Sequence, residues 1–192
     1  EWCDKAYDHV QELDKEFSDW LCVPRSVRTT SIKPSGTVSL LNGSTPGIHY
    51  PEAEYYIRRI RFSTGNVILK AIEEAGYHIE EDAYSPNTMV ASFPVHEPFF
   101  QKGKSEATMW EQLEIAAAYQ HYWADNSVSV TVTFNGDEAK DIKTALEMYE
   151  SRLKAVSFLR FQETGYKQAP YEPITKEQYE EMSKNITPID RI

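Results

Sequence analysis

Cysteine is scarce in this chain of 192 residues, in which only Cys3 and Cys22 occur. Neither lies in a Cys-x-x-Cys pair or in a metal-ligand spacing, which argues against a disulfide framework or a zinc site. A reducing compartment, the cytoplasm, is the natural expectation for such a chain. No apolar run is long enough to cross a bilayer, so no membrane partner is expected. The first residues include no initiator Met and no signal peptide, which suggests that the chain was cut from something longer.

Positive charge is also in short supply, because 30 acidic side chains outnumber 20 basic ones and the formal net charge is −10. An acidic surface repels a phosphate backbone, so nucleic-acid binding is not expected. Any phosphate that binds must do so through local donors. The length and the hydrophobic share of 41% suffice for one ordinary domain with a core.

Apolar periodicity predicts helices over 2–20 and 66–75, and β-branched composition predicts strands over 27–32, 55–62 and 88–95, the last broken by a proline. A helix over 108–123 begins with a capping box formed by Thr108 and Glu111.

The second half of the chain contains the clearest strand, over 128–134, followed by a helix with Ile142 and Leu146 on one face and a short strand over 155–159. Such a unit predicts two parallel strands. Thr175 and Gln178 cap a last short helix. The predicted fold class is α/β.

The first chemical candidate is the turn 34–39, where small residues and hydroxyls follow a predicted strand. Converging N–H and O–H donors at a helix N-terminus can hold phosphate without a cation. Spaced glycines and a Lys-Ser/Thr ending are absent, so this is not a Walker loop. Taken alone, such a segment is more often simply a turn. The candidate residues are Pro34, Ser35, Gly36, Thr37, Val38 and Ser39.

A second candidate combines His49 with Arg58, Arg59 and Arg61. Three arginines within four positions can bind an anion. The alternative is an exposed strand whose arginines pair with nearby Glu52 and Glu54. A lone loop histidine is more often neither a ligand nor a titrating group.

The third candidate is the aromatic helix 110–123 with the segment that follows it. Its stripe of rings could hold a flat cofactor, but helical spacing favours core packing. His121 and Asp125 have the spacing of a weak metal pair without an evident third ligand, so no metal site is predicted.

Taken together, the residues resemble class II ribonucleotide reductases, which depend on adenosylcobalamin, and most closely the monomeric ribonucleoside-triphosphate reductases. The resemblance covers nearly the whole chain in order. It is carried by residues 29–41, 44–49, 55–61, 110–113, 123–131, 154–159 and 166–172.

The resemblance implies the last portion of a ten-stranded α/β barrel: a leading helix over 1–22, a barrel segment over 27–160 and a C-terminal extension over 161–192. It also implies that the turn 34–39 holds the substrate phosphates and that segments near the C-terminus contact the cobalamin. The cofactor-binding candidates are His49, Tyr50, Tyr166, Gln168, Pro170 and Tyr171.

The implied reaction is a radical reduction of a ribonucleoside triphosphate or diphosphate, in which adenosylcobalamin generates a cysteine thiyl radical. The family's Asn-Pro-Cys-Gly-Glu motif and its C-terminal cysteine pair do not occur here. Arg160 also stands where the family pattern has proline. No catalytic residue is therefore expected in this chain, which should be catalytically silent by itself.

The implied partners are a ribonucleotide substrate, a thioredoxin-type reductant and the missing N-terminal part of the reductase, in the same chain or as the product of a split gene. The alternative is an inactive module that binds nucleotide phosphate or a corrinoid on its own.

Overall fold

A computed structural model describes residues 1–35, 38–41, 44–161 and 167–187. The chain forms two compact units, each built from two separate stretches, rather than the single core that its length suggested. Unit 1 consists of residues 1–50 and 106–162, and unit 2 of residues 51–105 and 163–192. The division into a leading helix, a barrel segment and a C-terminal extension stays a prediction.

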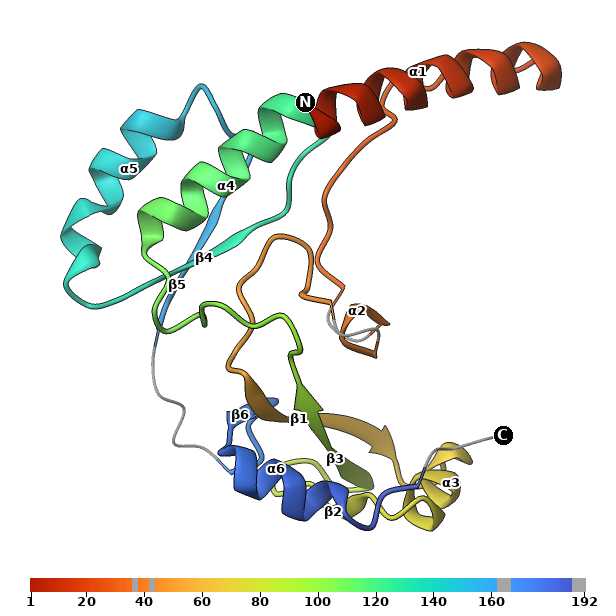
Figure 1. Cartoon of the computed structure of the whole chain (residues 1–192), viewed down its shortest axis with the longest axis vertical. Coiled ribbons are helices and arrows are strands. Elements are labelled where there is room, and N and C mark those ends of the chain that lie inside the picture. The colour runs from red at the N-terminus through yellow and green to blue at the C-terminus, as the bar shows by residue number, and fades with distance from the viewer. Residues whose placement is uncertain (36–37, 42–43, 162–166, 188–192) are drawn as a thin grey trace. The chain divides into compact units, whose positions relative to one another are not determined.

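Unit 1 begins with the predicted long helix, α1 (Trp2–Leu21), whose first turns lie beside α4 (Met109–Tyr122) in Figure 1. Cys22 ends α1 in a left-handed conformation with φ 54°. The predicted capping box of α4 is present, since the Thr108 hydroxyl accepts from Glu111 N–H and the Glu111 carboxylate accepts from Thr108 N–H. These helix ends are local features, and the sequence predicted them correctly.

The sheet of unit 1 is a parallel pair, β4 (Thr131–Phe134) and β5 (Ser157–Arg160), as predicted. The connection runs through a 3₁₀ turn, η1 (Glu138–Asp141), and the helix α5 (Ile142–Tyr149). The predicted strand over 27–32 is reduced to one parallel bridge between Ile32 and Val128. A four-residue helix, α2 (Val38–Leu41), was not predicted.

The core of unit 1 lies between α4, α5 and the β4–β5 pair, and its most buried side chains include Met109, Leu113, Val128 and Val132. One polar side chain is buried with them. The Gln112 amide donates to Thr133 C=O at 2.8 Å and accepts from Thr133 N–H at 2.9 Å, as a neighbouring strand would. This pairing satisfies backbone groups at the edge of β4.

Unit 2 is an antiparallel sheet in the order β2-β3-β1-β6. Its strands are β1 (Tyr55–Ser63), β2 (His78–Glu81), β3 (Thr88–His96) and β6 (Tyr171–Pro173), and its helices are α3 (Ile68–Glu74) and α6 (Lys176–Ser183). β2 and β6 were not predicted, whereas the capping box of α6 at Thr175 and Gln178 was. Figure 1 places α6 alongside the sheet, and it contacts β1 and β3.

Two details show how unit 2 tolerates unusual groups. β3 continues through Pro94, which was expected to break it, because β2 pairs only as far as Ser92 and leaves that side of β3 without a strand. The buried Tyr56 hydroxyl donates to the Glu97 carboxylate at 2.8 Å. Burial, together with this bond, raises the pKa of Tyr56 well above its ordinary value.

Candidate functional site

The candidate phosphate turn leaves the sheet of unit 1 directly after Ile32. Ser129 N–H donates to Ile32 C=O at 3.0 Å, and the Lys33 ammonium donates to the Ser129 hydroxyl at 2.8 Å. Beyond Lys33 the chain departs from the neighbouring strand and enters the turn. The turn follows the carboxyl end of the Ile32 segment, which bridges Val128 just before β4 begins.

Ser35 and Ser39 hold each other within the turn. Ser35 Oγ accepts from Ser39 N–H at 3.1 Å, and Ser39 Oγ donates to Ser35 C=O. The Ser39 hydroxyl proton is therefore used inside the turn, while the Ser35 hydroxyl proton has no acceptor among the described residues. A hydroxyl with a free proton can donate to an anion.

Of the other four residues of the turn, the structure describes two. Pro34 is exposed, and Val38 is the first residue of α2. Gly36 and Thr37 lie outside the described residues. The chain returns to the turn at Ser44, whose N–H donates to Ser39 C=O at 3.0 Å.

Gly47 packs against the start of the turn. Its φ is +60°, and a Cβ atom there would lie 3.3 Å from Lys33 O and 3.5 Å from Ile32 Cγ2. A residue with a side chain would be strained in this conformation and would crowd the Lys33 carbonyl. The backbone at the turn therefore favours glycine at this position.

His49 follows in the same loop, and both of its ring nitrogens have backbone partners. Nδ1 lies 2.8 Å from Pro46 O, and Nε2 accepts from Thr131 N–H at 3.0 Å. Since Nε2 accepts, the proton is on Nδ1 and donates to the carbonyl. Neither nitrogen is free to ligate cobalt or to bind a cofactor amide in this arrangement. Tyr50, the next residue, is half-buried.

The cofactor-binding candidates near the C-terminus belong to unit 2, except that Tyr166 lies outside the described residues. The Gln168 amide accepts from Ala83 N–H at 2.8 Å and donates to Glu81 C=O at 2.8 Å. Pro170 C=O accepts from Arg59 N–H at 2.9 Å. The Tyr171 ring packs under the Arg58 guanidinium at 4.5 Å. Three of these four residues thus hold β6 and its approach against the rest of unit 2.

The three arginines of β1 bind this same segment of the chain. Arg59 donates to Ala169 C=O at 3.0 Å and pairs with Glu172 at 2.5 Å. Arg61 donates to Gln168 C=O at 3.2 Å and pairs with Asp82 at 2.5 Å.

The suggested pairing of these arginines with Glu52 and Glu54 is wrong. Glu52 lies 3.5 Å from Lys104, and Glu54 lies 3.9 Å from His96. The local sequence could not reveal the true partners, because Asp82 lies 21 residues and the others about a hundred residues further along the chain.

In unit 1, the Asp125 carboxylate likewise binds a segment that is distant in the chain. Its carboxylate accepts from the backbone N–H of Thr29 and Thr30 at 3.0 and 3.1 Å and from the Thr29 hydroxyl at 3.1 Å. Burial opposes ionisation of Asp125, but the hydrogen bonds from Thr29 and Thr30 outweigh it and hold the pKa of this carboxyl below its ordinary value. The carboxylate that spacing had suggested as half of a metal pair instead anchors the segment before the turn.

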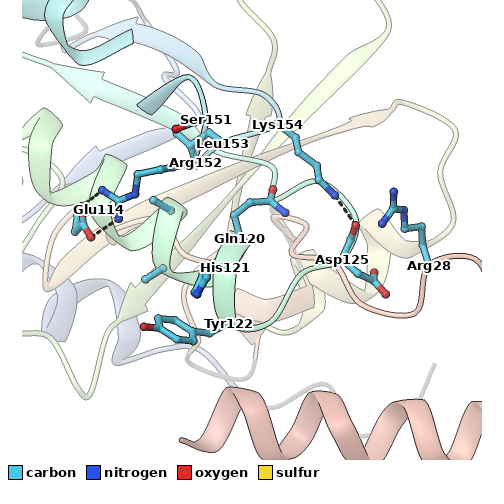
Figure 2. Close-up of a pocket in the computed structure, with 12 residues that line it drawn as sticks. Arg28, Glu114, Gln120, His121, Tyr122, Asp125, Ser151, Arg152, Leu153 and Lys154 are labelled. Carbon is cyan, nitrogen blue, oxygen red and sulfur yellow. Dashed lines mark hydrogen bonds and ion pairs between the residues drawn. The ribbon is translucent and has the colours of Figure 1, made fainter. Parts of the chain in front are cut away.

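A cavity of about 590 Å³ in unit 1 lies beside this anchor (Figure 2). The bidentate pair of Arg152 with Glu114, together with the Tyr149 hydroxyl, holds the pKa of Glu114 below its usual range. Lys154 donates to Asp125 C=O, and Arg28 lies nearby. Because Thr29 and Thr30 precede Ile32, the cavity is at the opposite end of this segment from the phosphate turn.

The described residues form no metal-ligand cluster, because no three of their His, Cys, Asp or Glu side chains lie close enough together to hold a metal ion. No helix in the described part of the chain is long and apolar enough to cross a membrane.

The aromatic side chains of α4 and its C-cap lie in two environments. Trp110 and Trp123 pack against the core, while Tyr119 and Tyr122 are exposed.

No protein-family model matches the chain. It is 44% identical to a probable adenosylcobalamin-dependent ribonucleoside-triphosphate reductase of Dictyostelium discoideum, over 99% of this chain and 26% of the relative. It is also 44% identical to the corresponding reductase of Euglena gracilis, over 96% of this chain and 26% of the relative. A crystal structure of a B12-dependent class II ribonucleotide reductase matches with a TM-score of 0.86 and 36% identity, over 97% of this chain and 27% of that one. The chain spans about a quarter of the length of these proteins.

Proposed function

Because this chain is homologous to about a quarter of the adenosylcobalamin-dependent class II ribonucleotide reductases, we propose that it supplies the substrate-phosphate side of such an enzyme. The intact enzyme would reduce ribonucleoside triphosphates, the substrates named for the relatives, to deoxyribonucleotides. The observation that carries the proposal is the Ser35 hydroxyl proton, which has no acceptor among the described residues, in a turn beyond the carboxyl end of the Ile32 segment.

Phosphate binding at this turn would rest on hydroxyl and backbone donors. Ser35 is the stronger candidate donor, since the Ser39 hydroxyl already donates to Ser35 C=O. An anion could recruit Ser39 only by breaking that bond. In an acidic chain, neutral donors of this kind can bind phosphate without a nearby cation.

The proposed contribution to the cobalamin surface is narrower than the resemblance implied. The polar groups of His49 and Gln168 are occupied by backbone partners, so these residues do not fit cobalt ligation or polar cofactor contacts as they are placed. What remains for the cofactor is apolar contact by Tyr50 in unit 1 and by Pro170 and Tyr171 in unit 2.

The remaining part of the reductase is the main partner that we propose, supplied by the same chain or by a second one. Within the described residues, β5 has a strand partner only on its β4 side. In unit 1, Trp2, Trp20 and Val27 are 88%, 68% and 90% exposed. Further barrel strands would pair with such an edge, and a protein partner would cover such exposed apolar side chains. A thioredoxin-type reductant is proposed for the intact enzyme only.

The alternative is a stand-alone module that binds nucleotide phosphate or a corrinoid without catalysis. Calorimetry of the isolated chain with nucleoside triphosphates and with adenosylcobalamin distinguishes the two. Submillimolar binding by the isolated chain would favour the module, whereas no binding would favour a dependent part of the reductase.

The phosphate assignment is tested by Ser35→Ala in the full reductase that carries this segment. We expect substrate binding to weaken by about 1–3 kcal/mol, the range for a hydrogen bond to a charged group. The matched control is Ser157→Ala, which removes an exposed hydroxyl from β5 in the same unit. An unchanged KM and kcat in Ser35→Ala would overturn the assignment.

A further inference from the structure

The edge of β4 that faces away from β5 is satisfied in an unusual way. Three backbone N–H groups along this edge, at every second residue from Ser129 onward, each donate to a different kind of acceptor. The donors are Ser129, Thr131 and Thr133, and their acceptors are Ile32 O at 3.0 Å, His49 Nε2 at 3.0 Å and Gln112 Oε1 at 2.9 Å.

The first acceptor is ordinary strand pairing, and the other two are side chains. The Ile32 segment cannot continue along β4, because after Lys33 it turns away into the phosphate turn. The next N–H along the edge, that of Thr131, would then lack a partner at a half-buried position. An unpaired backbone donor of this kind costs free energy comparable to a lost hydrogen bond. The His49 imidazole supplies the acceptor that a continuing strand would have offered to Thr131 N–H.

His49 can play this part only as the Nδ1–H tautomer. Nδ1–H donates to Pro46 C=O within the loop, and the lone pair of Nε2 accepts from Thr131 N–H. Protonation of Nε2 would set one N–H against another and remove the acceptor. Histidine is the side chain that changes protonation near neutral pH, so this contact can respond to acidification.

We propose that His49 is a positioning residue for substrate binding: as a neutral imidazole it pins the loop 44–50 to β4 and thereby holds the phosphate turn in place. This inference rests on the proposed function of the turn. The link runs from His49 through Gly47, which abuts Lys33 O, and through Ser44, whose N–H donates to Ser39 C=O.

Among the described residues, the elements that bind or abut the His49 loop carry few other titratable groups. The elements against it are its own loop, the Ile32–Lys33 segment and residues 128–134. Their titratable side chains are Tyr50 and Lys33, and the Lys33 ammonium donates to the Ser129 hydroxyl. Tyrosine and lysine side chains ordinarily change protonation well above the range of histidine.

The test measures KM and kcat against pH in the full reductase. His49→Leu removes both hydrogen bonds, and we expect KM for the nucleoside triphosphate to rise about tenfold, the effect of losing about 1.4 kcal/mol, with kcat changed less than the KM. His49→Gln offers an amide oxygen to Thr131 N–H and does not titrate, so we expect a KM near that of the unchanged enzyme. In the unchanged enzyme KM should rise on acidification from neutral pH, and in His49→Gln it should rise less. The matched control is His121→Gln, which replaces an exposed histidine of the same unit.

The outcomes separate this inference from the phosphate assignment on which it rests. If Ser35→Ala leaves KM unchanged, the phosphate turn itself is overturned. If Ser35→Ala raises KM but His49→Leu does not, only the role of His49 is overturned. Should His49→Leu fail to fold, His49→Gln decides: a pH dependence of KM equal to that of the unchanged enzyme would overturn the proposal, and a flattened one would support it.

Discussion

In each unit a charged side chain binds backbone groups of a distant segment, but the two side chains carry opposite charges. In unit 1, the Asp125 carboxylate accepts from the backbone N–H groups of a segment about 95 residues earlier. In unit 2, the Arg59 guanidinium donates to a backbone carbonyl 110 residues later. Each anchor satisfies backbone groups of a segment that has few or no strand partners, and each thereby fixes a distant stretch of chain beside the core.

The difference between the anchors lies in their response to conditions. A carboxylate can be protonated, and its hydrogen bonds then weaken, whereas a guanidinium stays charged at any ordinary pH. The units also differ in their optical probes, because Trp2, Trp20, Trp110 and Trp123 all belong to unit 1. Tryptophan fluorescence therefore reports on unit 1, while circular dichroism reports on both.

The largest effect is expected from Asp125→Ala. It removes the acceptor of several hydrogen bonds from Thr29 and Thr30 and leaves half-buried N–H groups without a partner. We expect a loss of about 3 kcal/mol in the free energy of unfolding, measured by urea titration followed by tryptophan fluorescence. Asp137→Ala in the loop before η1 serves as the control. A loss no greater than that of the control would contradict the role of Asp125 as an anchor.

The corresponding change in unit 2 is Arg59→Met. It deprives the buried Ala169 carbonyl of a donor and Glu172 of its partner, and we expect a loss of about 2 kcal/mol. The loss should appear in circular dichroism with little change in the tryptophan signal. Arg152→Met, which breaks an exposed pair in unit 1, is the matched control and should change stability less. If both arginine variants were equally stable, the comparison between buried and exposed anchors would fail.

A smaller effect is expected from Gly47→Ala. The left-handed φ of +60° and the close approach to Lys33 O predict a cost of about 1 kcal/mol in the free energy of unfolding. Gly65→Ala is the control, because a Cβ there meets nothing within 4 Å. Equal urea midpoints for the two variants would show that the loop does not depend on this close contact.

The smallest effect is the acid response of unit 1. The folded pKa of Asp125 is lowered, so its contribution to stability is present above the ordinary aspartate pKa of about 4 and is lost as pH falls through the lowered value. Asp125→Asn should flatten this part of the stability profile, measured by fluorescence during acid titration. A profile unchanged by the substitution would assign the acid response to other carboxylates.

Much of the local structure could be predicted because its causes lie close together in the chain. The apolar spacing of α1 and the capping boxes of α4 and α6 rest on a few neighbouring residues, and the parallel β4–β5 pair follows from one continuous strand–helix–strand stretch. The same local logic failed for the strand over 27–32. Its β-branched composition is typical of a strand, but its backbone N–H groups at Thr29 and Thr30 bind Asp125 instead.

The sequence by itself determined the helix ends and the strand–helix–strand unit. Residues 29–49 and the matching segments that follow them also determined the resemblance to class II ribonucleotide reductases. Only the tertiary structure decided which groups are free to act. Among the described residues no acceptor takes the Ser35 hydroxyl proton, whereas the His49 ring and the β1 arginines are engaged by partners up to 112 residues away. Hydrogen-bond donors and acceptors look alike in a sequence whether or not they are satisfied, and the folded chain alone brings their partners within reach.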